Sequence, residues 1–182
     1  MTDLDLDRAL DDLDAAREAF VARVGALTDA QRTYRPAPEA WSPTEIAEHL
    51  WRTEKGLAWG LDRQVQAGDD RRDLGPRDPD GMNRLRDALG SGGRMRMPES
   101  VARHIAPQGA SWDEVRGAWR ATGDEWRRVA ATVPDGLAGV GVLSHAISGP
   151  LTPAEGARFA ALHAEHHGRQ LDRVEADAGF PA

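Results

Sequence analysis

Two histidines near the C-terminal end of the chain have the spacing of a metal-binding pair. His163 and His167 are four residues apart, and side chains at that spacing lie side by side on a helix, with Cβ atoms about 5–6 Å apart. Two such imidazoles can share one divalent ion, because each ligating nitrogen needs to approach it to about 2.0–2.1 Å. Two ligands hold a metal poorly, so a third is expected from elsewhere in the fold. The best candidate is His49.

The apolar pattern predicts that these three histidines face one interior. On the helix expected after Ser42, the inward stripe consists of Ile46, His49, Leu50, Thr53 and Leu57. On the last helix it consists of Phe159, Leu162, His163, His167, Gln170, Leu171 and Val174, with His166 at its edge. The alternative is a polar core of three hydrogen-bonded histidines. For three converging imidazoles we favour metal coordination over the polar core. Burying unpaired imidazoles would cost stability, and coordination removes that cost.

Four amphipathic helices are expected to position these residues. The first spans about Leu4 to Leu27, where apolar residues recur at three- and four-residue steps. Each of the next three begins with a capping box, a Ser or Thr followed three residues later by Glu. These boxes start at Ser42, Ser111 and Thr152. We therefore predict an all-α fold, a four-helix bundle of the antiparallel type, in a single domain over residues 1–182.

Two long segments separate the later helices. Ala67 to Pro98 is rich in Gly, Asp, Arg and Pro, and a short helix is expected within it over Asp80 to Leu89. So long a connection in a compact domain is either an active-site cover or a mobile excursion, and both readings remain open. We expect it to lie across one end of the bundle. The second segment, Val133 to Leu151, is expected to be irregular.

The third helix carries tryptophans at heptad spacing. Trp112, Trp119 and Trp126 follow one another at seven-residue intervals. Large apolar side chains in that pattern are typical of a packed seam between helices. We therefore assign them to the core rather than to a cofactor site.

Composition excludes several classes of protein. The chain has 182 residues with 40% hydrophobic content and a mean hydropathy of −0.57, and it lacks a run of about 18 apolar residues, so no membrane partner is expected. Its acidic start does not resemble a signal peptide. The net charge of −7 argues against a nucleic-acid partner. Without cysteine, any metal must bind nitrogen or oxygen. These features together favour a cytoplasmic location.

Three separated fragments make the chain recognisable. They are the stretch from Trp41 to Leu50, the Ala106-Pro107 pair, and a closing block with His145, Gly149 to Glu155, and His163 to Leu171. In this order and spacing they resemble the DinB/YfiT-like superfamily of metal-binding four-helix bundles, in particular the DinB_2 type. The resemblance extends from the first helix to Val174, and the Ala67 to Pro98 segment is its least family-like part.

The resemblance implies a ligand set and a metal. Its three ligands, one His in the second helix and a His-x-x-x-His pair in the last, match His49, His163 and His167. The implied metal is nickel or zinc, with solvent completing the shell. His145 matches a frequent family position but is not assigned as a ligand. Three neutral histidines with open positions are typical of a catalytic metal site rather than a closed structural one.

The family also implies a reaction class. Its characterised members include transferases that use bacillithiol or mycothiol, so the expected function is a metal-dependent S-transferase. Its partners would be a small-molecule electrophile and a low-molecular-weight thiol, which a chain without cysteine would receive as a cosubstrate. A hydrolase using metal-bound water is one alternative. A non-enzymatic, stress-linked metal-binding or interaction module is another, and a fourth protein ligand would favour it. The oligomeric state stays open, with a homodimer among the alternatives.

Two other metal sites are excluded by the residues themselves. A di-iron carboxylate bundle needs Glu-x-x-His on two helices, and none of the four histidines at 49, 163, 166 and 167 has Glu three residues before it. A zinc-protease helix needs His-Glu-x-x-His, whereas His163 is followed by Ala164.

Overall fold

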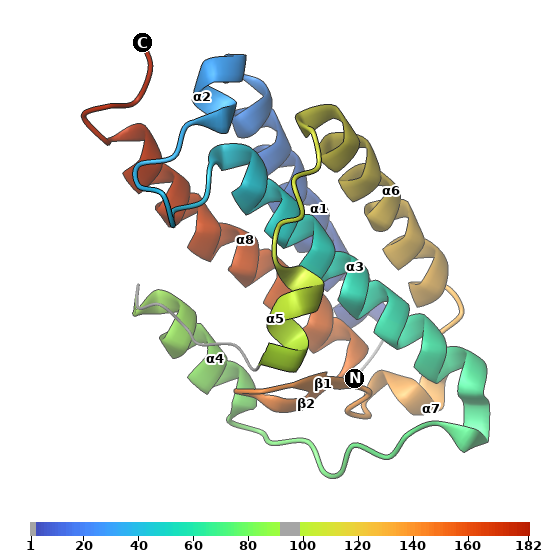
Figure 1. Ribbon diagram of the computed structural model, residues 1–182. Helices are drawn as coiled ribbons and strands as arrows, with labels where there is room; N and C mark the ends of the chain where they lie inside the picture. Colours follow the sequence, from blue (N-terminus) through green and yellow to red (C-terminus); the bar gives the residue numbers. More distant parts are fainter. Residues whose placement is uncertain (1–2, 92–98) are drawn as a thin grey trace.

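Four long helices form the body of the protein, as shown by the computed structural model, which describes residues 3–91 and 99–182 (Figure 1). They are α1 (Asp3–Gly25), α3 (Pro43–Ala67), α6 (Trp112–Ala130) and α8 (Pro153–Glu175). The shorter elements are α2 (Asp29–Thr33), η1 (Gly68–Asp70), α4 (Gly81–Gly90), α5 (Glu99–Ile105), α7 (Asp135–Ala138), β1 (Leu143–His145) and β2 (Gly149–Leu151). The predicted all-α bundle is confirmed.

The helix starts are formed as their sequences predict. Ser42, Ser111 and Thr152 each accept a hydrogen bond from the backbone N–H three residues later, and the Glu at that position bonds back to the capping residue. Each box satisfies two backbone N–H groups that the first helical turn leaves unpaired. The same device, with Gln31 in place of Glu, begins the short helix α2 at Thr28. That helix was not predicted, although its Thr-x-x-Gln pattern signals it.

The two apolar clusters of the core show which way each helix runs. One cluster joins the N-terminal halves of α1 and α8 to the C-terminal halves of α3 and α6, and includes Leu10, Leu61 and Trp126. The other joins the opposite halves and includes Val24 and Ile46. Thus α1 and α8 run in one direction, and α3 and α6 run in the other (Figure 1). The expected antiparallel arrangement therefore fails for two neighbouring pairs, α3 with α6 and α1 with α8, which pack side by side in parallel.

The parallel course of α3 and α6 explains the long segment between them. The chain leaves α3 at one end of the bundle and must return to the other end before α6 can begin, a distance of about 30 Å at 1.5 Å per residue. The return path crosses that end first, where Arg77 Nε donates to Glu155 Oε1 at 2.8 Å. It then follows the side of the bundle, with α4 against α8 and α5 against α3.

The expected excursion across one end is therefore correct only for its first part. The short helix expected over Asp80 to Leu89 is present as α4, with Leu85 and Leu89 buried against the core. Within the predicted Ala67 to Pro98 segment, residues 92–98 lie outside the described ranges. None of the helices in the described part of the chain has the length and apolar character needed to cross a membrane.

The segment from Val133 to Leu151 is more regular than expected. It contains α7 and a two-stranded antiparallel hairpin in which Leu143 pairs with Leu151 and His145 with Gly149. The prediction of an irregular segment is wrong here because three-residue strands are too short to show an alternating pattern. The hairpin packs Leu143 and Leu151 into the core, so it closes the bundle next to the start of α8.

The tryptophan seam of α6 is confirmed at two of its three positions. Trp119 and Trp126 are 1% and 0% exposed and belong to the two core clusters. Trp112 is only partly buried, because it is the first residue of the helix and packs at the edge of its cluster. The seam therefore helps to hold α6 against the bundle.

A methyl group at Gly81 is expected to destabilise the docking of α4. A Cβ at this position would lie 2.3 Å from the carbonyl oxygen of Ser148 in the hairpin, and backbone atoms cannot yield easily. Gly81→Ala should lower the free energy of unfolding by about 1–3 kcal/mol. Gly90→Ala is the matched control, because nothing lies within 4 Å of a Cβ there. Equal urea-denaturation midpoints for the two variants would contradict this packing.

Candidate metal centre

Three histidines from two helices converge at one point in the bundle. His163 Nε2 lies 3.2 Å from His49 Nε2 and 3.0 Å from His167 Nε2. The three side chains are 5–7% exposed, so they are buried but not sealed from solvent. Among the described residues these three form the group of His, Asp and Glu side chains that could hold an ion, with ligand atoms within 4.8 Å of one another. The structure thus brings together all three histidines that the sequence singles out.

The outer nitrogens of two rings are already engaged. His49 Nδ1 lies 2.9 Å from the carbonyl oxygen of Ile105, which can only accept, so this nitrogen carries the proton. His167 Nδ1 lies 2.7 Å from Gln170 Oε1, which places its proton in the same way. Both rings therefore direct an unprotonated Nε2 toward His163. Fixing the tautomer through the second nitrogen is how metal-binding histidines are usually oriented.

This arrangement fits a divalent cation. Two lone pairs face His163 Nε2, and a neutral ring can donate at most one proton there. One close contact would therefore remain unsatisfied in a purely hydrogen-bonded cluster. An ion about 2.0–2.1 Å from each nitrogen, at tetrahedral or octahedral angles, requires nitrogen pairs about 2.8–3.4 Å apart, which includes both observed distances. The positions of these nitrogens therefore fit a group of three histidines that could hold an ion.

Burial keeps the three imidazoles neutral. Loss of solvent lowers the pKa of His49 and lowers the pKa of His167 to about 3. The pKa of His163 falls well below its usual range, first through burial and then through the neighbouring imidazoles His167 and His49. Only neutral imidazoles bind metal. The site therefore presents three candidate ligands that need no deprotonation at neutral pH.

Aromatic side chains line two sides of the centre. The Trp41 ring lies 4.8 Å from the His49 ring and 6.3 Å from the His167 ring, measured between centroids. Phe159 stacks on His163 at 5.4 Å with an interplanar angle of 26°. These rings restrict solvent around the nitrogens and hold the imidazoles in place. Trp41 comes from the segment before α3, so the centre draws on three parts of the chain.

The two neighbouring histidines have other partners. His145 Nδ1 accepts hydrogen bonds from the backbone N–H groups of Ile147 and Ser148, each at 3.3 Å. Burial lowers the pKa of His145 to about 4, so it is a neutral ring with its proton on Nε2. His166 Nδ1 lies 2.7 Å from the Leu89 carbonyl oxygen of α4. Neither belongs to the converging group, and the sequence assigns neither of them as a ligand.

Several residues around the centre were not predicted. The carbonyl of Ile105 has no signature in the sequence, because every residue carries one. Gln170 was placed on the inward stripe without a role, and its position three residues after His167 is the signal that could have assigned it. Glu48, beside His49, is 1% exposed and accepts three backbone hydrogen bonds. Glu48 was not predicted because an acidic residue beside an apolar helix stripe is normally expected to be exposed to solvent.

The metal-free protein is expected to lose stability as the pH falls below about 6.5. Unfolded imidazoles titrate near 6.5, whereas burial lowers the folded pKa of His145 to about 4 and that of His167 to about 3. Between these values the unfolded state binds more protons. Each such histidine should therefore reduce the free energy of unfolding by about 1.4 kcal/mol per pH unit in that window.

Urea denaturation of the metal-free protein between pH 7.5 and pH 4.5 measures this dependence. His145→Gln should make it shallower by removing one of the contributing groups. Identical slopes for this variant and the wild type would show that His145 is not held neutral by the fold.

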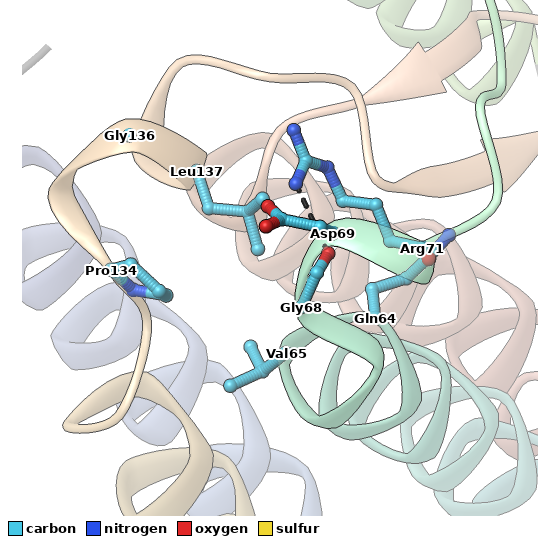
Figure 2. Close-up of a pocket in the computed structure, with 8 residues that line it drawn as sticks. All are labelled: Gln64, Val65, Gly68, Asp69, Arg71, Pro134, Gly136 and Leu137. Carbon is cyan, nitrogen blue, oxygen red and sulfur yellow. Dashed lines mark hydrogen bonds between the residues drawn. The ribbon is translucent and has the colours of Figure 1, made fainter.

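The pocket in Figure 2 lies far from the histidines. It has a volume of about 250 Å³ and lies between the end of α3 and the segment after α6, where Val65, Asp69, Arg71 and Leu137 contribute to its lining. Val65 is about 24 Å from His49 along the axis of α3 at 1.5 Å per residue. The Arg71 side chain already donates to the Gly68 carbonyl at 3.1 Å. This hollow is therefore separate from the histidine centre.

Fold and site together define a helical bundle with a buried triad of neutral histidines that could hold a divalent ion. The sequence profile of the DinB superfamily matches residues 12–171, a span that contains all three histidines. The chain belongs to the DinB superfamily. Comparisons with curated proteins and with solved structures gave no significant match.

Proposed function

We propose that the protein is a metal-dependent S-transferase. It joins a low-molecular-weight thiol of the bacillithiol or mycothiol type to a small-molecule electrophile, with His49, His163 and His167 as ligands of nickel or zinc. The observation that carries this proposal is the convergence of three neutral imidazoles on one point. Three protein ligands leave coordination positions for solvent or substrate, which is the arrangement of catalytic rather than structural sites.

The chemistry that a bound nickel or zinc ion supplies is Lewis acidity, which favours a thiolate over a thiol at neutral pH. The protein's own residues prepare the place for it. Ile105 and Gln170 orient two of the imidazoles through their Nδ1 atoms. Trp41 and Phe159 limit the water around the centre, which strengthens electrostatic interactions there.

The composition of the chain supports the partners of the proposed reaction. A chain without cysteine has no thiol nucleophile of its own, so the thiol of the proposed reaction arrives as a cosubstrate. The net charge of −7 supports a small-molecule partner rather than a nucleic acid. The acceptor is an electrophilic carbon that forms the new C–S bond as its leaving group departs.

Two measurements test the proposal in order. Metal analysis of protein purified without an affinity tag should find about one nickel or zinc ion per chain. A conjugation assay should then show that metal-loaded protein accelerates the reaction of bacillithiol or mycothiol with an alkylating electrophile, whereas chelated protein does not. Metal-dependent hydrolysis in the absence of thiol would instead favour a hydrolase that activates water at the same centre.

A further inference from the structure

The end of α5 and the residues that follow it, before α6 begins, are held by one face of α3. We call residues 104–110 the connector. Arg52 Nε donates to the carbonyl oxygen of His104 at 3.1 Å, and His49 Nδ1–H donates to that of Ile105 at 2.9 Å. Residues at positions 48, 49 and 52 of a helix lie on neighbouring parts of its surface. A single patch of α3 therefore sets the course of the connector past the metal centre.

Glu48 is the strongest anchor in that patch. Its carboxylate accepts the backbone N–H of Gln108 at 2.7 Å and those of Gly109 and Ala110 at 3.1 Å each. The side chain is 1% exposed, so its charge is stabilised mainly by these three donors and by Arg52, whose Nη1 is 3.7 Å away. Hydrogen bonds to a buried carboxylate are among the strong ones in proteins.

The anchored end of the connector is only a short distance from the acceptor of His49. Ala106 and Pro107 alone separate Ile105 from Gln108, and the proline ring restricts the backbone between them. Gly109 has a φ of 84°, a conformation that other residues adopt rarely. This turn lets successive N–H groups point at one carboxylate. Moving residues 108–110 would therefore move the Ile105 carbonyl as well.

We propose that Glu48 is a positioning residue for the metal centre. It holds the connector so that the Ile105 carbonyl accepts the Nδ1 proton of His49 and leaves Nε2 free for the ion. The inference rests on the proposed metal-dependent function and adds to it a residue that touches neither metal nor substrate. When a metal-binding histidine loses the group that hydrogen-bonds its second ring nitrogen, metal binding weakens by about 10–100-fold.

Glu48→Gln tests the proposal. The amide keeps the shape of the side chain, but its NH₂ group faces at least one backbone N–H that the carboxylate now accepts. Zinc binding by the tag-free protein, measured by competition with a chelator, should weaken by about tenfold or more. In the metal-free variant, ¹⁵N NMR of the imidazoles should show His49 losing its preference for the Nδ1–H tautomer. Amide exchange at residues 108–110 should accelerate.

Glu54→Gln is the matched control. Glu54 is a second buried carboxylate of α3, 2% exposed, but its partners are Arg17 and Trp119, and it does not touch the connector. Its substitution should lower the unfolding midpoint while leaving zinc affinity and the His49 tautomer unchanged. Gly109→Ala strains the connector without altering Glu48, so it should reproduce the weaker binding if Glu48→Gln folds poorly.

The outcomes separate the two proposals. Wild-type affinity and tautomer in Glu48→Gln, despite faster exchange at residues 108–110, would overturn the positioning role. Equal loss of affinity in the Glu48 and Glu54 variants would overturn it too, because both would then act through stability. If the wild-type protein binds neither zinc nor nickel, the proposed function fails, and the tautomer of His49 in metal-free protein still decides the role of Glu48.

Discussion

Replacing His163 or His167 with alanine is expected to abolish stoichiometric binding of nickel or zinc. His163 Nε2 is the central atom of the triad, within 3.2 Å of the Nε2 atoms of both other rings. Removing either residue of the α8 pair leaves two ligands, which hold a metal poorly. The affinity should fall by more than the roughly 10–100-fold that is typical of losing a residue that only orients a ligand. Isothermal titration of tag-free protein measures it.

His166→Ala is the matched control, because it removes an imidazole from the same turn of α8. His166 Nδ1 is bonded to the Leu89 carbonyl of α4 and lies outside the converging group. This variant should retain one ion per chain, although α4 should be held less firmly. Equal loss of binding in all three variants would mean that the faces of α8 are assigned wrongly.

Much of the centre could be predicted because its three histidines lie on long helices. The spacing of His163 and His167 is a local property of one helix, and the capping boxes at Ser42 and Thr152 set the helix starts from which their faces are counted. The position of His49 among apolar residues then places it inside. The paths of the segments that join the helices do not affect this prediction, because the helical period alone sets the direction of each side chain.

The surroundings of the centre depend on contacts that no local pattern records. Ile105 contributes a backbone carbonyl, and Glu48 contributes a carboxylate to N–H groups sixty residues away. The parallel course of α3 and α6 was missed for the same reason, because helix direction depends on the path of the connection. The hairpin at Leu143 to Leu151 is too short for its alternation to be read. Tertiary contacts decide all of these features.

Loss of His49 is expected to remove S-transferase activity while the bundle remains folded. His49 is the one histidine of the converging group that comes from α3, so His49→Ala leaves a pair on one helix. The two apolar clusters do not include it, so the main cost is an unpaired Ile105 carbonyl and a small cavity. The free energy of unfolding should fall by about 1–3 kcal/mol, and circular dichroism should show the helical content unchanged.

The assay compares metal-loaded and chelated wild-type protein with His49→Ala, each given bacillithiol or mycothiol and a panel of alkylating electrophiles. Conjugation above the uncatalysed rate is expected for metal-loaded wild-type protein alone. Without the ion, nothing at the centre stabilises the thiolate form of the thiol at neutral pH. A His49→Ala variant that is folded, metal-free and still active would place the reaction elsewhere on the molecule. If metal-loaded wild-type protein does not exceed the uncatalysed rate for any combination of thiol and electrophile, the transferase proposal is wrong. The same ion would then serve hydrolysis or a non-enzymatic role.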